Sequence, residues 1–455
     1  MEKYTLIQLD RARHRPLAAG VVALLSLAAP QAFASTTWTV TDCGDDVFDS
    51  ATLRSTVANP SVQSGDTVAI ACSTVSLSTG ELAINQTNLT LLGALALLPT
   101  SIAGTIDHEG TGVLALEYLT LRDGGGHTPD MGTLHLTRGG CVYSKGSVVL
   151  SHSTVAGCSA YNGAQTKYVA AQGGGVFAAH NLIMVSSSIS YNAAITLGGR
   201  IDGGGAYVGG NVVAKYSTIS GNLATLPNSN VDNSAMRGGG LWVYGNVSIS
   251  NSTISGNSAF SGGGGIEQGI GGTSFYVSDS TISGNTPLGL LVYSSATIQN
   301  STIAFNAYAG VSTNYALTLK NTLIAGNGMY DVRLPTTPGF VVQGGNNLVR
   351  TVSDKVKAQL PPDTLTGVCP LLGPLRDNGG ATLTHALYSG SPAIDAGADD
   401  AAIAYDQRGG PQPVPDPIPP PPLAYARDSG AHADIGAYET QQRDAIFSGG
   451  LEGCP

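Results

Sequence analysis

Apolar and small polar residues alternate along short stretches of this chain. The clearest stretch is Asn246-Val247-Ser248-Ile249-Ser250, and Leu82-Ala83-Ile84-Asn85 has the same pattern nearer the N-terminus. A period of two places the apolar side chains on one face of an extended strand and the polar ones on the other. The pattern therefore predicts short β-strands with one buried face.

These strands belong to a repeat. The phrase Ser217-Thr218-Ile219-Ser220-Gly221-Asn222 returns at 252–257 and 280–285, and looser copies end at Asn192, Asn306 and Asn327. The successive Asn positions are 30, 35, 28, 21 and 21 residues apart. A shortest repeat of 21 residues is too short for a helical repeat and suits one coil of a parallel β-helix. We predict an all-β solenoid built as a single-stranded parallel β-helix.

A second phrase, a glycine triplet followed by an apolar residue, recurs out of phase with the first. It reads Gly173-Gly174-Gly175-Val176-Phe177 and returns at 203–207, 238–242 and 263–267. The length from each Asn to the next triplet varies widely, so we expect variable loops along one edge of the coil stack. Equivalent residues of stacked coils lie roughly 4.8 Å apart. We therefore expect each Asn to take left-handed backbone at a turn and to hydrogen-bond its copy in the next coil.

The N-terminal residues have the pattern of an export signal. Arg11, Arg13 and Arg15 precede an apolar run from Leu17 to Ala29, and Ala32-Phe33-Ala34 has the small-x-small form of a signal-peptidase site. We predict cleavage after Ala34, with an uncleaved membrane anchor as the alternative. Cleavage removes four basic and two acidic residues and moves the formal net charge from −10 to −12. An acidic surface argues against nucleic acid or an anionic membrane as the partner, and we expect no membrane span after cleavage.

Six cysteines in an exported chain predict disulfides. Cys141 stands where later coils carry the third glycine, and Cys158 stands where they carry the Asn. These two positions flank a variable loop, so we predict that they pair. The other expected pairs are Cys43 with Cys72 and Cys369 with Cys454. The alternative of free thiols or metal ligands is disfavoured, because no Cys-x-x-Cys motif or neighbouring His is present.

The residue after each glycine triplet should point inward, so the residue after that should point outward. The outward positions hold Tyr143, Phe177, Tyr207, Trp242 and Glu267. We expect an exposed aromatic strip beside the variable loops, suited to stacking on sugar rings. The alternative is that the rings stack on one another to stabilise the sheet, or lie hidden under the loops. Tyr244 and Tyr293 are expected to extend the strip.

The C-terminal part lacks the repeat and has motifs of its own. Its motifs are Leu372-Gly373-Pro374-Leu375-Arg376-Asp377-Asn378-Gly379-Gly380, Gly390-Ser391-Pro392-Ala393-Ile394-Asp395-Ala396-Gly397, Asp406-Gln407-Arg408-Gly409 and Asp434-Ile435-Gly436-Ala437-Tyr438-Glu439. They resemble the choice-of-anchor Q domain, which accompanies right-handed parallel β-helix repeats in exported bacterial proteins. Thr52-Leu53-Arg54 is similar to the CSLREA-type start of the same proteins, although the fuller Ser-Leu-Arg form is absent. The resemblance implies right-handed coils and export, and says little about chemistry.

These observations divide the chain. The predicted parts are a signal peptide at 1–34, an N-terminal cap and first coils at 35–100, regular coils at 101–330, and last coils with the choice-of-anchor Q-like region at 331–455, which includes a Pro-rich loop at 411–422. The acidic residues of the last part are candidates for holding Ca²⁺; they are Asp395, Asp406, Asp434 and Glu439. We instead expect no cofactor, because Arg408 lies in the same motifs and Arg–Asp pairs would lock loops that close the end of the solenoid.

Catalytic residues are harder to assign. Parallel β-helices include pectate-lyase-like and polygalacturonase-like enzymes, whose grooves use calcium with an Arg or Lys base, or a pair of acidic residues. The catalytic candidates here are Asp202, Arg237, Glu267, Lys167 and Arg200. Asp202 and Arg237 fall on neighbouring rungs, where an ordinary salt bridge explains them. No dense acidic cluster or lyase motif is present, which favours a protein without enzymatic activity.

The sequence therefore predicts an exported monomer, secreted or on the outer cell surface, that binds a polysaccharide or a cell-surface glycan as a binding or adhesive protein. The first alternative is a pectate-lyase-like polysaccharide lyase or a glycoside hydrolase on the same scaffold. The second alternative is a passive structural surface protein.

Overall fold

The computed structural model describes residues 35–94, 99–128, 135–164, 169–227, 236–335, 339–399, 404–409, 425–427 and 429–441. The described residues from Thr36 onward belong to one compact unit. The predicted signal peptide at 1–34 and the Pro-rich loop at 411–422 lie outside the described residues.

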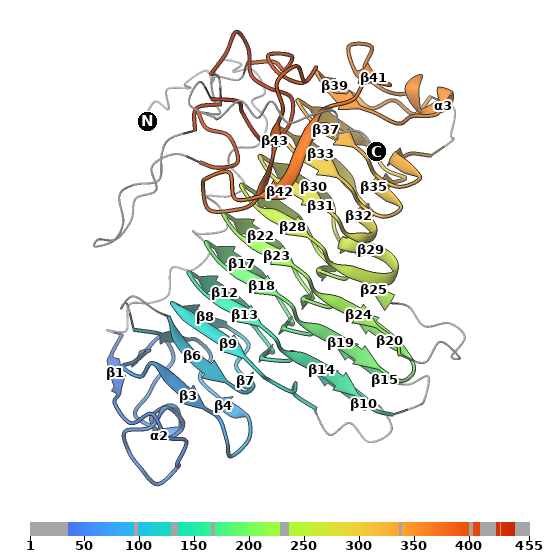
Figure 1. Ribbon diagram of the computed structural model, residues 1–455. Helices are drawn as coiled ribbons and strands as arrows, with labels where there is room; N and C mark the ends of the chain where they lie inside the picture. Colours follow the sequence, from blue (N-terminus) through green and yellow to red (C-terminus); the bar gives the residue numbers. More distant parts are fainter. Residues whose placement is uncertain are drawn as a thin grey trace, which may run out of the picture. The chain divides into compact units, whose positions relative to one another are not determined.

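The described chain winds into a parallel β-helix whose coils are made of short strands (Figure 1). The first sheet contains, in order, β1 (Thr37–Val40), β2 (Thr67–Ile70), β5 (Leu89–Leu92), β8 (Val113–Glu117), β12 (Ser147–Ser151), β17 (Leu182–Val185), β22 (Val212–Lys215), β27 (Val247–Ser250), β30 (Ser274–Ser278), β33 (Ser295–Gln299), β36 (Leu317–Lys320) and β39 (Gln343–Gly345). The second sheet contains β3 (Thr74–Ser76), β6 (Thr100–Ala103), β9 (Leu119–Arg122), β13 (Thr154–Ala156), β18 (Ser188–Ser190), β23 (Thr218–Ser220), β28 (Thr253–Ser255), β31 (Thr281–Ser283), β34 (Thr302–Ala304), β37 (Leu323–Ala325), β40 (Leu348–Val349) and β41 (Leu365–Thr366).

The third sheet carries the residues that follow the glycine triplets. Its strands within the coils are β4 (Leu82–Ile84), β7 (Ile106–His108), β11 (Val142–Ser144), β16 (Val176–Ala178), β21 (Ala206–Val208), β26 (Leu241–Val243), β29 (Ser258–Gln268), β32 (Thr286–Val292), β35 (Ala309–Thr313) and β38 (Tyr330–Arg333); three further strands that pair on through β29 are described below. Every strand pair within these three sheets is parallel, so the all-β fold predicted from the repeat is confirmed. At the N-terminal end, Thr52 caps the short helix α2 (Leu53–Ala58), whose buried Leu53 and Val57 join the core of the coils.

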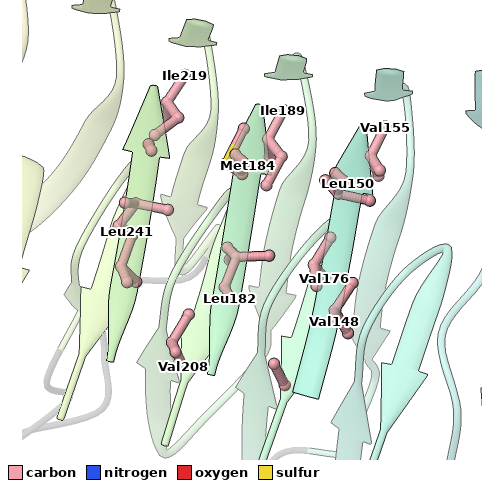
Figure 2. Packing of buried hydrophobic residues seen from close by; sticks show 14 of the residues in the cluster. Val148, Leu150, Val155, Val176, Leu182, Met184, Ile189, Val208, Ile219 and Leu241 are labelled. Carbon is pink, nitrogen blue, oxygen red and sulfur yellow. The ribbon is translucent and has the colours of Figure 1, made fainter. Parts of the chain in front are cut away.

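The core is a continuous column of apolar side chains. Val148 pairs in register with Leu182, and Leu182 pairs with Val212, so each inward residue lies over its equivalents in the next coils. Figure 2 shows Leu150 and Met184 stacked in the same way, with Ile189 and Ile219 entering from the second sheet. The period-two pattern of each strand therefore becomes one buried face that runs through successive coils.

The repeated Asn residues form a buried ladder, as predicted. The Nδ2 of Asn222 donates to the Oδ1 of Asn257 at 2.8 Å, and Asn257 repeats this bond to Asn285 at 2.9 Å. The ladder ends at Asp331, whose Oδ1 accepts from Asn327 at 2.9 Å. The predicted left-handed backbone is wrong for these Asn residues. It belongs to the residue before each of them, such as Gly221 at φ 63°, so the turn is made one position earlier and the Asn side chain points inward.

The glycine triplets allow close contact between coils. A Cβ atom on Gly204 would lie 2.4 Å from the carbonyl oxygen of Gly239 in the next coil. Gly203 has a φ of 75°, in the left-handed region that favours glycine. The triplet is therefore required where the chain turns back into the third sheet.

Two of the predicted disulfides are present. Cys141 is bonded to Cys158, and Cys43 is bonded to Cys72, each with a Cα–Cα distance of 5.5 Å. The pairing of Cys369 with Cys454 stays a prediction, because Cys454 lies outside the described residues. Within the described part, no helix is long and apolar enough to cross a membrane.

The C-terminal region packs against the flank of the coils. After helix α3 (Asp354–Lys357), the antiparallel pair β42 (Leu372–Arg376) and β43 (Thr384–Leu387) follows. Gln407 donates to the hydroxyl of Thr253 at 3.0 Å, and the hydroxyl of Thr281 donates to Gln407 at 2.6 Å. Leu372 and Ile435 share a second apolar cluster with strands β34, β37 and β40. The predicted position across the end of the solenoid is therefore wrong for these residues, which bind to the outer face of the second sheet.

Candidate functional site

The variable loops stack into a lateral projection, which we call the arm. One layer of the arm is β14 (Ser159–Asn162), β19 (Ala193–Thr196) and β24 (Leu223–Thr225), continuing into β29. The other layer is β10 (His135–Arg138), β15 (Val169–Gln172), β20 (Arg200–Asp202) and β25 (Met236–Arg237). Figure 1 shows the arm strands along one edge of the coils, where the spacing predicted the loops. Between its two layers the arm has a small apolar core of Ala171, Ala194, Ile201, Ala224, Met236 and Ala259.

Four aromatic residues of the third sheet form a continuous stack, which we call the aromatic column. They are Tyr143, Phe177, Tyr207 and Trp242, in register on β11, β16, β21 and β26. Their ring centroids are 5.3, 4.8 and 4.8 Å apart, with interplanar angles of 18°, 6° and 15°. The sequence prediction that these side chains share one line on the outside of the sheet is therefore confirmed.

The predicted exposure of this line is wrong. Tyr143, Phe177 and Trp242 are only 4%, 5% and 5% exposed, and Tyr207 is half-buried. The arm strands β10, β15, β20 and β25 end just before each glycine triplet, and their side chains lie over the rings. The guanidinium carbon of Arg138 is 4.8 Å from the centre of the Phe177 ring. The alternative, in which the rings stack on one another under the loops, is the one that the structure shows.

The covering side chains form a hydrogen-bonded row of their own. Arg138 donates to Gln172 at 3.0 Å, and Gln172 donates to Asp202 at 3.3 Å. Arg237 donates to Asp202 through two nitrogens at 3.0 and 2.8 Å, which confirms the expected salt bridge. Arg200 pairs with the other oxygen of the same carboxylate. Asp202 is completely buried between the two arginines, so its two oxygens hold the row together.

Glu267 follows Trp242 in register and was predicted to be exposed, but only 3% of it is accessible. The irregular segment Ser261-Gly262-Gly263 of β29 lies against it, and the Oε2 atom accepts from the Gly263 N–H at 3.0 Å. Burial raises the pKa of Glu267 to about 7, against the opposing effects of that hydrogen bond and of Arg237. Glu267 therefore titrates near neutral pH.

The raised pKa of Glu267 has a consequence for stability. The folded protein holds a proton on this carboxyl between its ordinary value of 4.5 and about 7, where the unfolded chain does not. This contribution to stability is full below pH 4.5 and is lost as the pH rises through 7, by about 1.4 kcal/mol per unit of pKa shift. We expect Glu267→Gln, which keeps an oxygen acceptor for Gly263, to remove that loss. Thermal unfolding of both proteins at pH 5 and pH 8 checks this; an equal pH dependence would contradict it.

Around Trp242 the arm leaves part of the site accessible. We call Arg200, Tyr207, Arg237 and Tyr244 the Arg–Tyr patch. The Tyr244 ring is 6.3 Å from the Trp242 ring and 48% exposed. The guanidinium carbons of Arg200 and Arg237 are 5.5 and 5.2 Å from the Trp242 ring centre, and these side chains are 46% and 29% exposed. Half-buried Tyr293 lies within the electrostatic reach of Glu267 and Arg237, at the edge of the patch.

The remaining sequence candidates do not gather here. Lys167 lies outside the described residues. The C-terminal carboxylates hold loops: Asp406 pairs with Arg408 at 2.7 Å, and Asp395 accepts from the Ala431 N–H at 2.8 Å. Asp434 accepts from the Asp395 N–H at 2.8 Å, and Glu439 accepts from the Asp434 N–H at 2.7 Å. Burial raises the pKa of Glu439 to about 8. These contacts support the structural interpretation of the four acidic residues rather than a calcium site.

One group of potential metal ligands was not predicted from the sequence. Single ligand atoms of Glu81, Asp107 and His127 all lie within 4.8 Å of one another. Asp107 occupies the position equivalent to Tyr143 one coil earlier. The repeat gave no signal for this group, because Gly124 lies beside Cys158, where other coils carry the Asn, and His127 follows it in a segment without a repeated counterpart.

Two comparisons found proteins with similarity to this chain. The family described as a right handed beta helix region matches residues 201–351, which include Tyr207, Arg237 and Tyr244 of the Arg–Tyr patch. The crystal structure of pectate lyase Pel9A is similar, with a TM-score of 0.46 and 14% sequence identity over 90% of this chain and 97% of that one. No curated protein sequence matches the chain. The strand topology and the family match show that this chain has the right-handed parallel β-helix fold.

Proposed function

We propose that this is an exported protein that binds a polysaccharide at the Arg–Tyr patch. The observation that carries the proposal is the grouping of accessible Tyr244, Arg200 and Arg237 around the Trp242 ring. Tyr rings offer flat apolar faces to sugars, and their hydroxyl groups and the guanidinium groups supply donors that orient the ligand. The site is smaller than the strip expected from the sequence, because the arm covers the rest of the column.

The charges of the patch favour an acidic polysaccharide. The whole chain has a formal net charge of −10, yet two guanidinium groups meet here and share one buried partner, Asp202. One positive charge is therefore left over unless Glu267 is ionised. A guanidinium group binds a carboxylate through parallel N–H bonds, so a sugar acid is the preferred ligand class.

Two substitutions test this site without removing a buried ring. We expect Tyr244→Ala and Arg200→Ala each to weaken retention on immobilised polygalacturonate or alginate by roughly tenfold, because truncating a Tyr or Arg anchor costs more than about 1 kcal/mol. Affinity electrophoresis or calorimetry measures the change. Trp242 and Tyr207 are poorer test positions, because both rings also stabilise the stack.

The chain offers matched controls. Tyr161 is 53% exposed on β14 of the arm, and Arg122 is an exposed arginine that also pairs with an aspartate. Tyr161→Ala and Arg122→Ala should retain wild-type binding. Equal losses in all four variants, or retention on neutral glucans only, would contradict the proposed site. No binding to any glycan would favour the passive structural alternative.

Cleavage of the same polysaccharide is a second candidate, and one observation favours it. Glu267 has a pKa of about 7 and lies beside Arg237 and Tyr293, which suits a general acid or base at neutral pH. The appearance of unsaturated or reducing ends, and their loss in Glu267→Gln, would favour an enzyme. Binding without product would favour a binding protein.

Two disulfides support the exported location. Such bonds form and persist in oxidising compartments and are rare in the cytosol, and both Cys43–Cys72 and Cys141–Cys158 are formed. Export also places the patch where a surface or environmental polysaccharide can reach it.

A further inference from the structure

We propose that Glu81, Asp107 and His127 bind a divalent transition-metal ion such as Zn²⁺. The Nδ1 atom of His127 is 2.7 Å from the Oε2 of Glu81 and 3.6 Å from the Oδ2 of Asp107. The three side chains come from separate segments: Glu81 precedes β4, Asp107 lies on the neighbouring strand β7, and His127 follows β9. Their ligand atoms converge at the end of the aromatic column beside Tyr143.

The histidine is held in place before any ion binds. Its backbone N–H donates to the Arg138 carbonyl at 2.8 Å, and the Arg138 N–H donates back at 2.9 Å. Its ring stacks on Tyr143 with a centroid distance of 4.3 Å and an interplanar angle of 21°. The ring plane is therefore fixed so that Nδ1 faces the two carboxylates. A ligand oriented in this way loses little entropy when it binds a metal.

An unsatisfied oxygen atom points to a missing partner. Asp107 is only 8% exposed, and among the described residues its Oδ1 atom has no hydrogen-bond partner. A buried carboxylate oxygen without a partner is costly. A proton on the Nδ1 of His127 can be donated to Glu81 or to the Oδ2 of Asp107, but it leaves the Oδ1 of Asp107 without a partner. A metal ion between the two carboxylates could be coordinated by both Glu81 and Asp107, because a carboxylate can ligate through either or both oxygens.

The local charges fit a dication. Lys145 pairs with the neighbouring Glu109, so these two charges cancel. Glu81 and Asp107 then have two negative charges, which one divalent ion balances when the imidazole is neutral. The nitrogen donor favours Zn²⁺ or a similar transition metal over Ca²⁺, which takes oxygen ligands. Three protein ligands leave at least one coordination position for water or another molecule.

Zinc titration of the full chain tests the site. The protein is prepared without a histidine tag, stripped with a chelator and titrated with Zn²⁺ in a calorimeter. We expect one ion per chain, and His127→Ala or Asp107→Asn should weaken its affinity by tenfold or more, since loss of even an outer partner of a metal ligand costs about 10–100-fold. Bound Zn²⁺ should also raise the unfolding temperature of the wild type but not of these variants.

His152→Ala is the matched control, because His152 also stacks on a tyrosine, Tyr118, with a centroid distance of 4.9 Å. It should bind Zn²⁺ as the wild type does. Glu81→Gln keeps the test valid if the buried Asp107 variant misfolds, since the Glu81 side chain is 37% exposed. Absence of Zn²⁺ binding in the wild type, wild-type affinity in His127→Ala and Glu81→Gln, or an equal loss in His152→Ala would overturn the proposal.

Discussion

Replacing Arg408 by methionine is expected to destabilise the C-terminal region by about 3–5 kcal/mol, the usual cost of removing one partner of a buried ion pair. Arg408 and Asp406 are completely buried at their side chains and pair at 2.7 Å. The guanidinium group also lies 3.9 Å from the ring centres of both Tyr425 and Tyr438, and it donates to the Glu439 carbonyl. Methionine fills similar space but leaves the Asp406 carboxylate without its charge partner.

The effect should be confined to the region that Arg408 holds. Because this region binds the flank of the coils, we expect faster amide hydrogen exchange across the described residues 372–399 and 429–441, and little change in coils β5 to β18. Arg122→Met, at an exposed pair with Asp123, should leave exchange unchanged. If Arg408→Met has wild-type exchange and an unchanged unfolding midpoint, the ion pair does not hold the C-terminal region in place.

Replacing Asn257 by alanine is expected to lower the free energy of unfolding by roughly 2–6 kcal/mol, at about 1–3 kcal/mol for each of two buried groups left without a partner. The Oδ1 atom of Asn257 accepts from both the backbone N–H and the Nδ2 of Asn222, at 3.0 and 2.8 Å. Its Nδ2 donates to the Ile219 carbonyl at 2.9 Å. Alanine therefore leaves two donors of Asn222 unsatisfied in the middle of the ladder.

Urea unfolding followed by circular dichroism measures this effect. Asn257→Asp should also destabilise, because the oxygen that replaces Nδ2 would face two acceptors, the Ile219 carbonyl and the Oδ1 of Asn285; Asp331 accepts from Asn327 at the end of the ladder. Asn85→Ala, at an exposed Asn, serves as the control and should change little. Equal stability of Asn257→Ala and the wild type would show that the ladder contributes nothing to the stack.

Most features of the coils could be predicted because they are local and repeated. In a stack of coils each residue lies over its own equivalent. The neighbours of a recurring Ile, Asn or Gly can therefore be inferred from the repeat itself. This is why the strand alternation, the contact of Asn222 with Asn257, and the pairing of Cys141 with Cys158 followed from spacing. The left-handed turn residue was assigned one position too late, because Gly221 and Asn222 both tolerate that conformation.

The candidate sites depended on segments that do not repeat. The order of residues placed Phe177, Tyr207 and Trp242 in one line, but their burial depends on the arm, whose strands are built from loops of irregular length and sequence. The cluster of Glu81 and His127 joins residues 46 positions apart, and no periodic signal links them. The C-terminal motifs likewise contain Arg408 and Asp406 but do not specify the outer face of the second sheet as their binding surface.

The amino-acid sequence by itself therefore determined the winding of this protein, the residues that stack at each level and one of its cross-links, because a repeated coil specifies its neighbours through self-complementary packing. The tertiary structure alone decided what covers the aromatic column, which of its edges reaches solvent and which carboxylates meet a histidine. Those outcomes depend on contacts between segments distant in the chain, where the free energy of packing is shared by residues that have no pattern in common.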